Sequence, residues 1–172
     1  MTQATGKNSG NDYQNQILKG VDFSGIDLTG ALFSNSIIHG VNFAKATLLN
    51  SNFEGAIIIG CNFTEAILQG TNAKGTLISG TNFITCDFKN SDFSECIIKG
   101  SNCIGGDWQN SKFNNSQISR SNFTNPDPQN IQFFGTTVTG SGMPTKSDGT
   151  TSLVHGVNYD DSTIWPDKPS IG

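Results

Sequence analysis

Four cysteines have the widest chemical range of any residues in this 172-residue chain: Cys61, Cys86, Cys96 and Cys103. Cysteines act as nucleophiles, metal ligands or disulfide partners, and each role needs a second group close by. A disulfide, for example, requires two Cα atoms within about 7 Å of each other. Whether these thiols can do such chemistry therefore depends on the elements that carry them.

A series of aspartates forms the second group of residues that could bind a ligand or ionise unusually. Asp87, Asp107 and Asp127 recur every 20 residues, and Asp27 belongs to the same series. Stacked carboxylates would bind a cation or raise one another's pKa. Lys89 is close enough in sequence to screen Asp87, so a structural role for the series stays open.

A five-residue repeat decides how all of these residues are placed. One register holds without a gap from Gln16 to Gly140, over 25 pentapeptides, and the third residue of each is termed its centre. Eleven of the twelve phenylalanines occupy centres, and the residue two positions earlier is usually small. A period of five fits neither a helix nor a strand. The unit must therefore turn, with one large and one small residue facing inward.

A second period of 20 residues shows how many units close one turn. Isoleucine occupies the same centre in five successive turns: Ile38, Ile58, Ile78, Ile98 and Ile118. Four pentapeptides per coil make such series vertical columns, which predicts a square coil stacked about six times at strand spacing. Phenylalanine columns would line two opposite walls and aliphatic columns the other two. Glycine at the last position of many units suits the corners.

Asparagine also forms a column at this spacing, comprising Asn42, Asn62, Asn82, Asn102 and Asn122. Stacked amides can hydrogen-bond along such a column. A polar residue that merely suits a turn would give the same pattern. Both interpretations stay open.

The repeat resembles the pentapeptide-repeat family, whose units read small, Asp or Asn, Leu or Phe, variable, Gly. Val21-Asp22-Phe23-Ser24-Gly25 and Ser51-Asn52-Phe53-Glu54-Gly55 match this pattern closely. The resemblance implies an all-β protein, a right-handed quadrilateral parallel β-helix. The segment from Tyr159 to Pro166 is similar to tails that follow the repeats in cyanobacterial members of the family.

The repeat argues against an enzyme. All four cysteines fall on inward positions, and none has another cysteine 20 residues away, so we expect free, buried thiols that act as small apolar fillers. His39 lies on an outward position and His155 lies in the tail, neither at a spacing that suggests catalysis. We therefore expect no catalytic residues, no metal site and no cofactor.

Three segments are predicted. Residues 1–15 are polar and are expected to be a disordered tail, and residues 16–140 form the repeat. Residues 141–172 are expected to be a linker and a cap over the last coil that includes Tyr159, Ile164 and Trp165. Pro126 and Pro128 should distort that coil, because proline cannot donate to a ladder. Unpaired thiols and the lack of an apolar signal core favour the cytoplasm.

One outward column departs from the usual Asp or Asn and is aliphatic instead: Ile17, Ile37, Ile57, Leu77 and Ile97. Exposed apolar stripes on flat surfaces serve association, with either a second copy or a partner. A preference of β-branched residues for a flat β wall would explain the same column.

The resemblance suggests two functions. Qnr-type members of the family are acidic rods that mimic DNA and protect DNA gyrase, which gives quinolone resistance. Here the repeat carries only nine acidic and seven basic residues, too little net charge to imitate a duplex. We therefore favour a non-enzymatic interaction scaffold or regulator. We expect a protein partner such as a regulator, no nucleic acid or membrane partner, and a monomer or weak homodimer.

Overall fold

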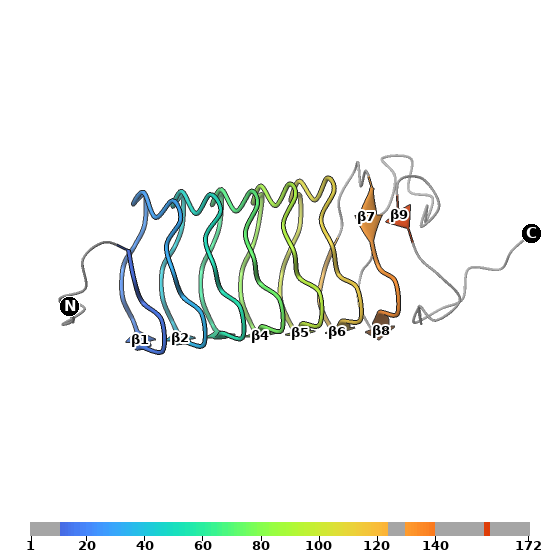
Figure 1. Ribbon diagram of the computed structural model, residues 1–172, viewed down its shortest axis with the longest axis horizontal. Helices are drawn as coiled ribbons and strands as arrows, with labels where there is room; N and C mark the ends of the chain where they lie inside the picture. The colour runs from blue at the N-terminus through green and yellow to red at the C-terminus, as the bar shows by residue number, and fades with distance from the viewer. Residues whose placement is uncertain (1–10, 124–129, 140–156, 159–172) are drawn as a thin grey trace, which may run out of the picture.

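The computed structural model describes residues 11–123, 130–139 and 157–158 and shows a solenoid. One short strand from each turn joins a parallel sheet that runs along the whole length of the solenoid (Figure 1). The strands follow one another in the sheet in chain order: β1 (Ile17–Lys19), β2 (Ile37–His39), β3 (Ile57–Ile59), β4 (Leu77–Ser79), β5 (Ile97–Lys99), β6 (Gln117–Ser119) and β8 (Thr137–Thr139).

The register between neighbouring turns is 20 residues throughout this sheet, as in the pairing of Ile37 with Ile57. The other three walls are joined by isolated parallel bridges with the same offset, such as Asn52 with Asn72. The prediction of an all-β parallel solenoid of about six turns, with four pentapeptides per turn, is confirmed. None of the described residues forms a helix long and apolar enough to cross a bilayer.

The C-terminal end of the solenoid carries a second, two-stranded sheet. In it β7 (Ile131–Gln132) pairs in parallel with β9 (Val157–Asn158), and the two lie side by side in Figure 1. β9 comes from the segment predicted to cap the last coil. The predicted cap residues Tyr159, Ile164 and Trp165, and the prolines expected to distort the coil, lie outside the described residues.

The corners share one backbone conformation. Every fifth described residue from Asn15 to Gly135 has φ between +52° and +69°. Glycine adopts this left-handed region without penalty and asparagine tolerates it. Sequence analysis recognised the glycine corners but not those occupied by asparagine or by a larger residue such as Thr85 or Arg120.

Aromatic columns fill two opposite walls, as predicted. The rings of Phe33 and Phe53 stack with centroids 4.6 Å apart and planes 7° apart. Where Ala73 and Cys103 interrupt these columns, the adjoining wall switches from leucine to Phe88 and Trp108, whose rings stack at 3.7 Å. Protein interiors keep a nearly constant packing density. We therefore infer that the large rings of Phe88 and Trp108 fill the volume that Ala73 and Cys103 leave in the neighbouring columns.

The first coil begins upstream of its predicted start. Asp12 forms a parallel bridge with Leu32, and the Tyr13 ring stacks on Phe33 at 4.9 Å. The prediction of a disordered tail over residues 1–15 is therefore wrong for residues 11–15, because Tyr13 supplies the centre of one more pentapeptide. Residues 1–10 lie outside the described residues.

Both interpretations of the asparagine column hold in its first turns. Asn42 Nδ2 donates to Asp22 Oδ1 at 3.0 Å, and Asn62 Nδ2 donates to Asn42 Oδ1 at 3.2 Å. The same Oδ1 of Asn42 accepts the backbone N–H of Ala44 at 3.1 Å. At Asn82 the ladder changes, because its Nδ2 donates to Thr64 Oγ1 instead. Asn42 and Asn62 thus each support their own turn and contact a neighbouring coil, whereas the buried Oδ1 of Asn82 has no hydrogen-bond partner among the described residues.

Candidate interaction surface

The wall that carries β1 to β6 and β8, termed the sheet wall, presents the aliphatic column to solvent. Ile17 is 64% exposed, Ile37 38% and Ile57 36%, whereas Leu77 and Ile97 are half-buried. In-register pairing makes these residues neighbours along the sheet. Ile59, 36% exposed, widens the column on β3. The aliphatic patch is defined as Ile17, Ile37, Ile57, Ile59, Leu77 and Ile97.

Charge is segregated between the walls, which sequence analysis did not notice. The sheet wall carries Lys19, Lys99 and Arg120, and all carboxylates of the described residues lie on the other three walls. The exposed His39 also lies on the sheet wall, on β2. Sorting the charged residues by their place in the 20-residue period would have revealed this asymmetry. The sheet wall is therefore a partly apolar surface whose charged side chains, among the described residues, are all basic.

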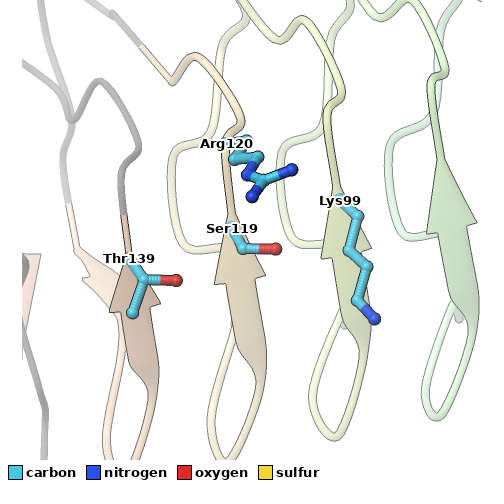
Figure 2. Close-up of a pocket in the computed structure, with 4 residues that line it drawn as sticks. All are labelled: Lys99, Ser119, Arg120 and Thr139. Carbon is cyan, nitrogen blue, oxygen red and sulfur yellow. The ribbon is translucent and has the colours of Figure 1, made fainter.

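A groove of about 490 Å³ opens at the C-terminal end of this wall. Its described lining consists of Lys99 on β5, Ser119 and Arg120 at the end of β6, and Thr139 on β8. Figure 2 shows the Arg120 guanidinium and the Ser119 hydroxyl on the side of β6 that faces β5, with the Lys99 side chain extended along β5. Sequence analysis did not predict this groove, because its residues are far apart in the chain.

The aspartate series lies on the wall opposite the sheet wall, where Lys89 bridges two of its members. Lys89 Nζ lies 2.8 Å from Asp107 Oδ2 and 3.7 Å from Asp87 Oδ2, and Gln69 Nε2 donates to Asp87 Oδ2 at 2.6 Å. The hydrogen bond to Asp107 and the charges of both aspartates raise the pKa of Lys89. Lys89 therefore takes the place that a bound cation would have, which favours the structural interpretation. Asp127 lies outside the described residues.

The cysteines are free and buried. Cys86 Sγ donates to the Phe63 carbonyl at 2.7 Å, and Cys96 Sγ to the Ala73 carbonyl at 2.9 Å. Burial raises the pKa of each of these two thiols to about 12, so they are protonated at neutral pH and unsuited to nucleophilic attack. Thr76 uses the same inward position to donate from Oγ1 to the Phe53 carbonyl. These small residues are therefore hydrogen-bond donors as well as the fillers that were predicted.

Within residues 11–123 and 130–139, no group of three or more His, Cys, Asp and Glu side chains is placed so that it could hold a metal ion. His39 is exposed, and His155 lies outside the described residues.

The geometry defines a class of protein, a parallel β-solenoid built from five-residue units, and the sequence comparison places the chain within it. Residues 46–123 match the family model described as a pentapeptide repeat region, and residues 17–55 match the model described as eight copies of pentapeptide repeats. The chain belongs to the pentapeptide-repeat family. No curated protein matches the sequence significantly.

Solved structures share the fold at low sequence identity. A trypsin-treated variant of QnrB1, a plasmid-mediated fluoroquinolone resistance protein, aligns with a TM-score of 0.61 and 20% identity, over 87% of this chain and 83% of that one. A second trypsin-treated variant gives 0.58 and 19%, over 88% and 91%. HetL, a pentapeptide repeat protein involved in heterocyst differentiation regulation from the cyanobacterium Nostoc sp. strain PCC 7120, gives 0.41 and 15%, over 91% and 81%.

Proposed function

We propose that this protein is a non-enzymatic interaction protein whose sheet wall binds a protein partner. The observation that carries the proposal is the aliphatic patch, which is exposed on a flat sheet and spans five consecutive strands. At strand spacing the patch extends over about 20 Å. A contiguous apolar surface of this kind favours association, because burying it releases water from apolar groups.

The charge of the sheet wall indicates the chemistry of the partner. With Lys19 near one end, Arg120 near the other and carboxylates confined to the other walls among the described residues, the wall suits an apolar surface bordered by acidic residues. Complementary charge at the rim speeds encounter and suppresses wrong partners. Regulators, including transcription factors, are among the partners we propose.

The same charge argues against tight self-association. If two sheet walls paired face to face, the basic side chains of one copy would lie against those of the other. The described residues of this wall include no carboxylate that could separate them. Like charges brought together at an interface are unfavourable. We therefore propose a monomer or at most a weak homodimer through this face.

Protection of a topoisomerase is the second candidate, and the fold shared with QnrB1 is the observation that favours it. Against it stands the repeat's excess of only two negative charges, whereas a DNA mimic must reproduce closely spaced phosphates. The sheet wall presents cations instead.

The proposal is tested by placing charge in the patch. Tagged protein carrying Ile37→Glu and Ile57→Glu is compared in cross-linking pull-downs from its native cells with wild type and with Ile67→Glu. Ile67 is 38% exposed on the opposite wall, so its substitution matches Ile57→Glu in chemistry and exposure. We expect a partner that cross-links to the sheet wall, is retained by Ile67→Glu and is lost from the double variant, while circular dichroism shows all three proteins folded.

Three results would contradict the proposal. If the double variant retained every partner that wild type captures, the patch would be architectural. In a parallel gyrase supercoiling assay, rescue from a fluoroquinolone would favour the second candidate. Analytical ultracentrifugation of wild type tests self-association, and a stable dimer abolished by the double variant would assign the patch to a second copy.

A further inference from the structure

We propose that the groove lined by Lys99, Ser119, Arg120 and Thr139 is a binding site for a phosphoryl oxyanion. The site lies at the C-terminal end of the sheet wall, on three neighbouring strands, and has a volume of about 490 Å³. It is separate from the exposed isoleucines at the other end of the wall. The two proposals share Arg120, and Ile97 of the aliphatic patch lies on the same strand as Lys99. Phosphate binding is measured in the absence of a partner, so the two proposals can fail separately.

The first argument is the pairing of the cations. Lys45, Lys74 and Lys89 each form an ion pair with a carboxylate across neighbouring coils, with the closest contacts at 3.7, 3.1 and 2.8 Å. Among the described residues, by contrast, neither Lys99 nor Arg120 forms an ion pair. The two cations line one groove on a wall where the described residues include no carboxylate. A bound anion would supply the counter-charge that neither cation has among the described residues.

The second argument is the backbone position of Arg120. The corner column that contains it holds glycine in every earlier turn, at Gly20, Gly40, Gly60, Gly80 and Gly100. Arg120 adopts the same left-handed conformation, with φ of +52°, which disfavours a side chain. Other non-glycine corners such as Lys45 and Thr85 share this conformation, so what sets Arg120 apart is that a cation replaces the glycine of its column beside the groove. The Arg120 N–H donates to the Thr139 carbonyl at 3.0 Å, which fixes the corner against β8.

The donor set indicates the class of anion. A guanidinium offers a planar fork of N–H donors, an ammonium offers three more, and the Ser119 hydroxyl adds one. A phosphoryl group brings a charge approaching −2 and three acceptor oxygens, whereas a carboxylate brings a charge of −1 and two oxygens. The groove thus fits a phosphoryl group better. The flexible stem of Lys99 allows its ammonium to reach the same ligand.

The test is a titration of the full chain with inorganic phosphate at pH 7.5 and constant ionic strength, followed by ¹⁵N–¹H correlation spectra. We expect saturable shifts confined to amides around Lys99, Ser119, Arg120 and Thr139. Acetate should bind at least tenfold more weakly, and O-phosphoserine about as well as phosphate. Lys99→Gln and Arg120→Gln should each weaken phosphate binding at least tenfold, whereas Lys19→Gln on the same wall should not change it.

Arg120→Gly provides a second readout that loss of folding would not imitate. Restoring the glycine of the column should raise the melting temperature while it removes phosphate binding. Shifts that do not saturate, or that spread evenly over the lysines, would overturn the site. Acetate binding as tight as phosphate would overturn its assignment to phosphoryl groups.

Discussion

The sheet wall and the wall opposite it, residues 26–30, 46–50, 66–70, 86–90 and 106–110, have the same interior and different exteriors. On the inner side, Cys96 and Ile98 of the sheet wall are as completely buried as Cys86 and Phe88 of the opposite wall. On the outer side, the sheet wall has an aliphatic patch and cations that form no ion pair among the described residues, and the opposite wall has aspartates bridged by Lys89. In the part of the chain that the structure describes, only the sheet wall carries ladder-paired three-residue strands, and the opposite wall has isolated bridges.

This contrast shows where the fold constrains the sequence. Each inward residue must pack against the residues 20 positions before and after it, so like residues recur in columns. An outward residue meets only solvent and its neighbours on the wall, so it can change without disturbing the stack. Differences between outer walls are therefore the part of the molecule free to encode recognition.

The largest expected effect separates inside from outside on both walls. Ile58→Ala on the sheet wall and Leu68→Ala on the opposite wall remove residues that are at most 3% exposed and should each cost about 2–5 kcal/mol of unfolding free energy. Ile57→Ala and Ile67→Ala, one residue away and partly exposed, should each cost less than about 1 kcal/mol. Urea denaturation of the four variants measures the difference.

The two outer variants, Ile57→Ala and Ile67→Ala, should lose similar amounts of unfolding free energy if both outer walls are free of the fold. A cost for Ile57→Ala that matched Ile58→Ala would mean that the patch is needed for the fold of the sheet. The patch would then be architectural. If Ile57→Ala and Ile67→Ala each cost little unfolding free energy, and equally little, the fold would not need the patch, and the patch would be free to bind a partner.

The inner thiols give a smaller effect that should be alike on the two walls. Burial raises the pKa of Cys86 and Cys96 to about 12, against about 8.5 in an unfolded chain. At pH 8 the folded thiols should react with a thiol reagent roughly a thousandfold more slowly than unfolded ones, because the thiolate is the nucleophile. With a chromogenic disulfide as the reagent, the absorbance of the thiolate that the reagent releases measures the rate.

The sign of the pH dependence follows from the same shift. Because the folded pKa is raised, the thiols stabilise the fold fully below about pH 8.5. This contribution is lost as pH rises toward the folded pKa of about 12. The stability of the Cys86→Ser, Cys96→Ser double variant should therefore fall less between pH 8 and 10 than that of wild type. If the stability of both proteins fell equally steeply with pH, the thiols would not be shielded from solvent in the folded state. Fast labelling of the native protein would show that the walls carrying Cys86 and Cys96 open readily.

Most of the interior was predictable from the sequence because stacking repeats it. The 20-residue recurrence of Ile38 and its successors was sufficient to predict the coil size and the walls. Tyr13 was missed, although counting back one unit from Leu18 leads to it, because the residues beside it are polar. The asparagine corners were missed because the family pattern draws attention to glycine.

The exterior was less predictable, since it depends on contacts between residues 20 apart. The pairing of Lys89 with Asp87 was anticipated from their nearness in sequence, but its shorter contact with Asp107 requires the coil geometry. Lys99 and Arg120 became candidates only when adjacent strands placed both beside one groove.

Removing the ion pairs of Lys89 with Asp87 and Asp107 on the opposite wall should have the smallest effect on stability. Lys89→Gln should lower the melting temperature slightly at low salt, because Asp87 and Asp107 then face each other without a cation. The deficit should shrink in 0.5 M salt, since exposed charges are screened. Lys112→Gln, an exposed lysine on another wall for which no ion pair is found among the described residues, is the matched control and should show neither effect. Differential scanning calorimetry at two salt concentrations measures both, and a salt-independent deficit would mean that Lys89 stabilises the wall through its aliphatic stem and not through its charge.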